Sequence, residues 1–223
     1  MFTIMARRVY GTMVTSSDYW QQACSDLSAR DATMARLIER FEGDRLDGSG
    51  HAFQTLVNAI VGQQISVAAA ESIWKRIRDL EPDLTPRGII ALDVDQLRSA
   101  GLSGRKTEYI QGIARAFADG TVDPARWYAM TDDEVRTQLT GLRGVGPWTA
   151  DMMLIFYLHR PDVLPLGDIG LVNGTTRLYG WDSTLQLRHR VPILREYAEL
   201  WRPWRTVATW YVWRDLDAEP VLY

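Results

Sequence analysis

Apolar residues recur at intervals of three and four along most of the chain. The stripe Phe53, Leu56, Val57, Ile60 and Val61 is one example, and others follow further on. This spacing puts apolar side chains on one face of a helix, and the few runs that alternate apolar and polar residues do not convincingly predict a strand. The pattern therefore predicts an all-α, multi-helix protein.

Capping residues and breakers set the expected ends of these helices. Asp31 and Ser66 precede apolar stripes, and Thr131 is followed three residues later by Glu134, as in a capping box. Glycine and proline separate the stripes. Helices are expected at 18–27, 31–41, 53–61, 66–77, 107–117, 131–140 and 147–158, from 168 onward, and as short segments after 85 and 93.

Composition narrows the class of protein without naming a function. The 223 residues are 46% hydrophobic, enough for one large domain or two small packed lobes. Cys24 is the single cysteine, which excludes a disulfide framework, a zinc ribbon and a four-cysteine iron–sulfur cluster within this sequence. The three histidines lie too far apart to suggest a metal cluster. A reducing compartment is expected.

Charge and hydropathy add two further expectations. The formal net charge of −3 argues against a non-specific coat for nucleic acid, although a local basic face is compatible with it. The first fourteen residues contain no secretory core, and nowhere do eighteen apolar residues follow one another. A cytoplasmic protein is expected, associated with the nucleoid if the source is bacterial.

A glycine-containing turn joins two of the expected helices. Gly144 and Gly146 permit unusual backbone angles and close approach, and Pro147 suits the first turn of the next helix. Free N–H groups at such a helix start can hold a phosphate without any basic side chain. The glycines alone are equally compatible with a plain helix–helix corner.

The segment Leu142–Ala150 resembles the hairpin of the helix-hairpin-helix DNA glycosylase superfamily. Asp168 follows Trp148 by twenty residues, after a loop rich in Pro and Gly, as the catalytic aspartate of that superfamily does. Within it, the chain is most similar to the 3-methyladenine DNA glycosylase II branch, in a short form, from about Arg36 to Trp213. The resemblance implies a DNA repair enzyme acting on double-stranded DNA that contains damaged bases.

That resemblance also implies an architecture. The whole of 1–223 would form one glycosylase unit of two helical lobes, with the active site in the cleft between them. One lobe would span 50–165 and carry the hairpin at 139–150; the other would combine 18–49 with 166–223. Much of the β-rich N-terminal lobe of longer bacterial relatives is expected to be missing.

Two further segments resemble DNA-contacting turns of the family. The segment 53–66 is similar to the helix and turn that carry a wedge for the space left by a flipped nucleotide, which makes Gln64 the candidate wedge. A solvated turn glutamine is the plainer alternative. Residues implied to contact the DNA backbone are Gly144, Val145, Gly146 and Thr149 at the hairpin, and Ser103, Gly104, Arg105 and Lys106 at the second turn.

Asp168 is the predicted catalytic residue. Positive charge develops on the sugar as a glycosidic bond breaks, and a carboxylate there stabilises it and can position or deprotonate water. An ordinary helix N-cap is the structural alternative, and the two roles are compatible because a cap fixes the carboxylate in place.

Trp148 occupies the position at which bifunctional relatives carry a Schiff-base lysine. An indole is not an amine nucleophile, so the enzyme is expected to be monofunctional, without β-lyase activity. Trp148, Met152 and Trp213 are the candidate walls of a pocket for a cationic alkylated purine. Either tryptophan is also compatible with plain core packing, and Met152 stands where a bacterial relative has a tyrosine, which implies a wider pocket.

No cofactor is expected to be required. The resemblance implies a monovalent Na or K ion on the backbone carbonyls of Thr140, Leu142 and Val145, and a monomeric protein. Three alternatives remain open: a glycosylase for oxidised or mismatched bases, a non-catalytic helix-hairpin-helix DNA-binding module, and a helical interaction protein with no DNA role.

Overall fold

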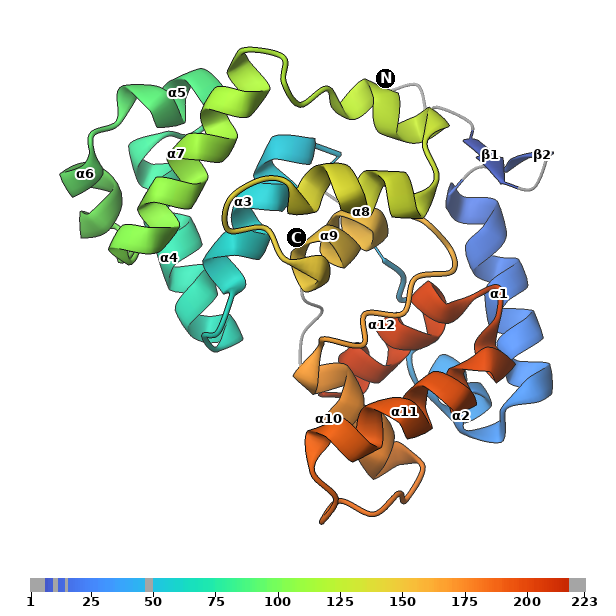
Figure 1. The fold of residues 1–223 in the computed structure, drawn as a ribbon. Helices are drawn as coiled ribbons and strands as arrows, with labels where there is room; N and C mark the ends of the chain where they lie inside the picture. The colour runs from blue at the N-terminus through green and yellow to red at the C-terminus, as the bar shows by residue number, and fades with distance from the viewer. Residues whose placement is uncertain (1–6, 10–11, 15, 47–49, 217–223) are drawn as a thin grey trace. The chain divides into compact units, whose positions relative to one another are not determined.

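The computed structural model describes residues 7–9, 12–14, 16–46 and 50–216 (Figure 1). Helices dominate these residues, and the predicted all-α fold is confirmed. One expectation is wrong in detail, because a short antiparallel pair of strands forms where no strand was expected. It joins β1 (Arg7–Val9) to β2 (Thr12–Val14), with Arg8 opposite Met13. Three-residue strands are too short to show a period of two in the sequence.

The described residues form two compact units. The first combines residues up to 46 with those from 159 onward, and the second runs from 50 to 158. The predicted location of the active site between two lobes stays a prediction.

The first unit is built from helices at both ends of the chain. It contains α1 (Ser16–Arg30), α2 (Ala32–Arg40), α10 (Ile169–Leu178), α11 (Leu187–Tyr197), the 3-10 helix η3 (Ala198–Trp201) and α12 (Arg205–Leu216), besides the two strands. The helix α12 packs against α1, α2 and α10, and most of its side chains are buried.

A buried carboxylate organises this core. Asp31 caps α2 through the N–H groups of Thr33 and Met34 and is 4% exposed. Its other oxygen accepts hydrogen bonds from Tyr179 Oη at 2.7 Å and Trp201 Nε1 at 3.0 Å. Burial beside this carboxylate raises the pKa of the Tyr179 hydroxyl. Trp201 is fully buried, so the carboxylate and this indole lie together in the core of the first unit.

The second unit is built around one almost wholly buried helix. It contains α3 (Ala52–Gly62), α4 (Val67–Leu80), α5 (Pro86–Ala91), α6 (Val94–Ser99), α7 (Gly104–Ala118), the 3-10 helix η1 (Pro124–Ala129), α8 (Asp132–Thr140), α9 (Pro147–Met152) and the π-helical turn η2 (Met153–Tyr157). The helix α3 packs against α4, α7, α9 and η2.

Candidate functional site

The predicted hairpin joins α8 to α9 in the second unit (Figure 1). Two backbone hydrogen bonds of 3.0 Å close the turn, from Leu142 N–H to Leu139 and from Val145 N–H to Leu142. Gly144 has φ +90°, and an added Cβ would lie 2.3 Å from the ring of Tyr109 on α7. Gly144 is thus required for packing, whatever else it contacts.

Gly146 differs from Gly144 in its surroundings. Its φ of −95° is open to any residue, and an added Cβ would meet no described atom within 4 Å beyond its chain neighbours. It is the N-cap of α9, where a glycine offers no side chain to cover the first N–H groups. The helix start therefore presents backbone donors beside open space, an arrangement that suits an anion.

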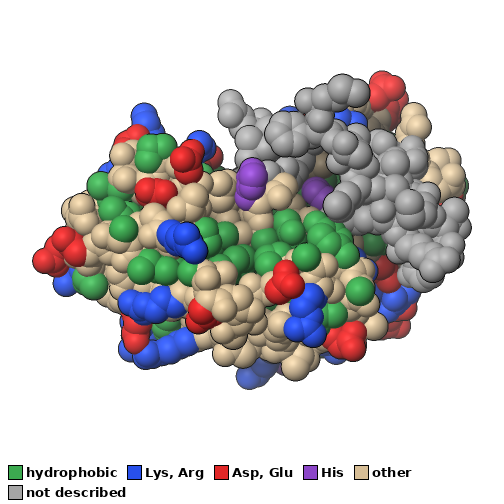
Figure 2. All heavy atoms as spheres, turned by 90° about the horizontal axis from the view of Figure 1, so that it is seen from above, with side chains coloured by type: hydrophobic (Ala, Val, Ile, Leu, Met, Phe, Trp, Pro, Cys, Tyr) green, Lys and Arg blue, Asp and Glu red, His purple; other side chains and the backbone are tan. Residues whose placement is uncertain are grey.

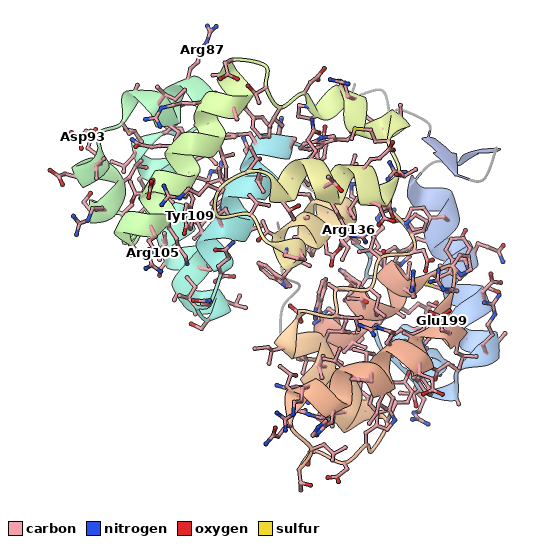
Figure 3. All side chains as sticks on the ribbon, in the orientation of Figure 1. Arg87, Asp93, Arg105, Tyr109, Arg136 and Glu199 are labelled. Atoms are coloured by element: carbon pink, nitrogen blue, oxygen red, sulfur yellow. The ribbon has the colours of Figure 1, made fainter. Side chains whose placement is uncertain are left out.

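An ion pair clamps the two helices of the hairpin. Arg136 on α8 donates from Nε to Asp151 on α9 at 2.8 Å, and from Nη1 to Asp133 at 2.9 Å (Figure 3). Asp151 is 8% exposed, and burial raises the pKa of its carboxyl group. The hairpin geometry is thereby fixed at its base.

The predicted wedge turn is joined to the hairpin by Gln63. Its side-chain Nε2 donates to the carbonyl of Gly144 at 3.0 Å and to Oγ1 of Thr149 at 2.9 Å. Thr149 is 1% exposed, so its side chain is internal. Gln64, the next residue, is exposed and has φ +58°. Gln63 therefore hydrogen-bonds the wedge turn to the hairpin, whereas Gln64, the predicted wedge, is exposed to solvent.

The second predicted contact turn, at the start of α7, contains two unlike cations. Ser103 caps the helix by accepting from the N–H of Lys106 at 3.3 Å, and Arg105 is exposed at this end of the helix (Figure 3). Lys106 instead points inward, where Nζ donates to the carbonyls of Val61 and Gln63 at 2.8 Å each. Burial lowers the pKa of its ammonium group.

Asp168, in the first unit, is the N-cap of α10. Its Oδ1 accepts from Leu171 N–H at 2.6 Å and from the indole Nε1 of Trp213 at 3.1 Å. Trp213 lies on α12, which approaches α10 so closely that a Cβ at Gly174 would come within 2.6 Å of Val212. The half-buried carboxylate is therefore held by its own helix and by the neighbouring one.

The three predicted pocket residues belong to different units. Trp213 is in the first, and Trp148 and Met152 are in the second. Trp148 and Trp213 are half-buried, whereas Met152 is 1% exposed and packs in the interior of the described fold. Their predicted role against a base stays a prediction.

The carbonyls expected to hold a monovalent cation lie on the hairpin. The Leu142 carbonyl accepts the 3.0 Å bond from Val145 N–H, and the Thr140 hydroxyl donates to the backbone carbonyl of Arg136 at 2.8 Å. In the part of the chain that the structure describes, no three His, Cys, Asp or Glu side chains gather as a metal site. The ion at the carbonyls stays a prediction.

Comparison with known proteins identifies the family. The family model described as HhH-GPD superfamily base excision DNA repair protein matches residues 57–203. The chain belongs to this superfamily. Among the described residues, no helix is long and apolar enough to cross a membrane.

Relatives in the superfamily are named for alkylated bases. DNA-3-methyladenine glycosylase 1 of Schizosaccharomyces pombe is 29% identical over 91% of this chain and 89% of that protein. The structure of the S. pombe 3-methyladenine DNA glycosylase with abasic DNA matches with a TM-score of 0.77 and 28% identity, covering 86% of this chain and 95% of the other. A DNA-3-methyladenine glycosidase from Bacillus halodurans matches with a TM-score of 0.71 and 32% identity, covering 88% and 89%.

Coverage and identity limit other comparisons within the superfamily. The chain covers 67% of DNA-3-methyladenine glycosylase 2 of Escherichia coli, at 28% identity. An 8-oxoguanine glycosylase/lyase of Clostridium acetobutylicum has a TM-score of 0.70 but only 14% identity, so that likeness concerns the fold alone.

Sequence reasoning missed the residues that tie the superfamily's turns together in this chain. The resemblance made Gln64 the candidate wedge, but Gln63 was visible only as the glutamine before it, with no signal for a role of its own. Tyr109 lies within the helix expected at 107–117, and nothing in its spacing indicates that it packs against Gly144. The Arg136–Asp151 pair joins residues on either side of the turn, and only the folded hairpin shows that they meet.

Proposed function

We propose that this protein is a monofunctional DNA-3-methyladenine glycosylase. It flips alkylated purines such as 3-methyladenine and 7-methylguanine out of double-stranded DNA and hydrolyses the N-glycosidic bond, leaving an abasic site. The observation that carries the proposal is Asp168, a carboxylate fixed by the start of α10 and by the Trp213 indole, in a chain of the base excision repair superfamily.

Hydrolysis of the N-glycosidic bond of an alkylated purine needs mainly a fixed negative charge near the sugar. As the bond from C1′ to the base nitrogen breaks, its electron pair leaves with the base and positive charge develops on the sugar. Asp168 stabilises that charge and orients the water whose oxygen bonds to C1′; the proton released from this water balances the reaction. An alkylated purine is already cationic, so it leaves readily, and aromatic faces such as Trp213 and Trp148 suit its binding.

The absence of a lyase step follows from the groups at the hairpin. Trp148 has no amine to attack C1′. The nearby Lys106 donates from its ammonium group to two backbone carbonyls, which is a poor arrangement for a nucleophile. Water is therefore the acceptor, and no cofactor takes part in these steps.

DNA binding is assigned to the turns of the second unit. The open start of α9 at Gly146, with Gly144, Val145 and the Thr149 N–H, faces one phosphate segment, and Ser103, Gly104 and Arg105 face another. A Na or K ion on the carbonyls of Thr140, Leu142 and Val145 would add a bridge to phosphate. The protein acts as a monomer in the cytoplasm, on the nucleoid in a bacterium.

Release of free bases from damaged DNA tests this function. Duplex DNA treated with a methylating reagent should yield free 3-methyladenine or 7-methylguanine, measured by chromatography. A matched duplex carrying 8-oxoguanine should yield none, and borohydride should trap no covalent adduct. Release of 8-oxoguanine with trapping would favour the oxidised-base alternative; binding without release from either DNA would favour a non-catalytic module.

A further inference from the structure

We propose that Gln63 and Lys106 are positioning residues that together hold Gln64 out as the wedge, and that Lys106 serves this purpose instead of contacting phosphate. The inference deepens the proposed function and rests on it for the premise that Gln64 enters the DNA stack. All the contacts that support it lie within the second unit.

The backbone at Gln64 needs support from its surroundings. Its φ of +58° is in the left-handed region, which costs a residue with a Cβ roughly 1–2 kcal/mol. The side chain is exposed, so its own packing supplies little of that support. Strained conformations of this kind persist where neighbouring contacts impose them.

Lys106 supplies the support on the backbone side. The carbonyls of Val61 and Gln63 point out of the C-terminal end of α3, where a cation is favoured by the helix dipole. Lys106 Nζ donates to both at 2.8 Å. The peptide that leads into Gln64 is therefore pinned from α7, and two of the three ammonium N–H groups are already engaged.

Gln63 supplies the support on the hairpin side. The two hydrogen bonds from its Nε2, to the Gly144 carbonyl and the Thr149 hydroxyl, cross 81 and 86 residues of sequence. Gly144 is in turn packed against Tyr109, so the acceptor has little freedom to move. The hairpin and the turn that carries Gln64 are thus held in one rigid arrangement, so the position of the wedge depends on that of the hairpin.

Arg105 provides the matched control for Lys106. It stands one residue earlier at the same helix start, is also cationic, and is exposed. Substituting a residue that neutralises a phosphate reduces the slope of log affinity against log salt by about 0.9. Substituting a residue that only positions the wedge leaves that slope unchanged.

The experiment compares Lys106→Met, Gln63→Leu and Arg105→Met on a duplex with an abasic-site analogue opposite a fluorescent base. For Arg105→Met, we expect the slope of log affinity against log salt concentration to become shallower by about 0.9. Lys106→Met and Gln63→Leu should keep the wild-type slope but lose the fluorescence change of wedge insertion. Lys106→Arg should restore that change in part. If Lys106→Met reduced the salt slope as much as Arg105→Met does, the proposal would be overturned.

A double-mutant cycle adds a second criterion. Lys106→Met and Gln63→Leu should each slow base release about tenfold in the wild-type background and have almost no effect once Gln64→Ala is present, because interacting residues are non-additive. Equal effects in both backgrounds would contradict the inference. If the wild type released no base, the proposed function would fail, whereas salt slope and fluorescence would still test the positioning.

Discussion

Trp213 combines an aromatic face with a hydrogen bond to Asp168 at 3.1 Å. The resemblance predicts that this tryptophan is a pocket wall, and the fold adds that its indole N–H restrains the carboxylate. This second property was out of reach of the sequence, because 45 residues separate the two side chains and only the packing of α10 on α12 joins them.

Trp213→Phe separates the two properties, since phenylalanine keeps an aromatic face and lacks the N–H. A hydrogen bond to a charged group contributes about 1.5–3 kcal/mol, so single-turnover base release should slow by about tenfold or more. Affinity for abasic DNA should stay close to that of the wild type. An unchanged rate for Trp213→Phe, with a slow rate only for Trp213→Ala, would show that the hydrogen bond contributes nothing.

Alanine substitutions at the two hairpin glycines, Gly144 and Gly146, should have different effects on stability and DNA binding. Gly144→Ala places a Cβ against the Tyr109 ring at φ +90°, so the free energy of unfolding should fall by about 2 kcal/mol. Gly146→Ala should cost only about 0.5–1 kcal/mol, because the added methyl group meets open space and only the N-cap preference for glycine over alanine is lost, but it should weaken binding to duplex DNA. Urea denaturation and DNA titration check both; equal stability of the two variants would contradict this distinction.

Helix starts with a capping side chain were predictable because that signal is local, whereas the helix expected at 107–117 begins earlier, at Gly104. Asp31, Ser66, Thr131 and Asp168 all cap helices through their own side chains, as the sequence predicts. The helix expected at 147–158 also forms, but its second half is π-helical, a change that no residue pattern announced. Contacts between elements, such as that from Gln63 to the hairpin, depend on tertiary packing.

At the level of paired helices, Arg136 is expected to stabilise the hairpin. Arg136→Met would leave Asp151 buried without its cation and lower the free energy of unfolding by about 2 kcal/mol. That loss is below the usual value for a buried pair, because 31% of the Arg136 side chain is exposed. Urea denaturation measures it, and Asp133→Asn, at the exposed end of the same network, should cost little.

The same substitution has a pH dependence of defined sign. Burial holds the pKa of Asp151 above the ordinary aspartate value of 3.8, and loss of the cation raises it further. A raised native pKa favours the protonated form, so the destabilisation of Arg136→Met should be smallest below pH 3.8 and grow as pH rises through the native pKa. A destabilisation independent of pH would contradict this electrostatic origin.

At the scale of the whole molecule, basic and acidic residues are nearly balanced, with 25 Lys and Arg against 28 Asp and Glu. On the face shown in Figure 2, the described basic and acidic side chains are interspersed, which agrees with the net charge of −3. Figure 3 likewise shows Arg87, Asp93 and Arg105 at separate places in the second unit, so cations and a carboxylate share its surface. Backbone N–H groups at helix starts can bind DNA phosphates without a continuous layer of basic residues, so such a surface is compatible with DNA binding.

Asp168→Asn is the most direct test of the central claim. Asparagine can still cap α10 and accept from Trp213, so the fold should be retained while the negative charge is lost. Base release from methylated DNA should fall by about 100-fold or more, with the melting temperature and DNA affinity little changed. Asp182→Asn, an exposed aspartate bound only locally to Thr184, serves as the control. Equal rates of base release by wild type and Asp168→Asn would contradict the account.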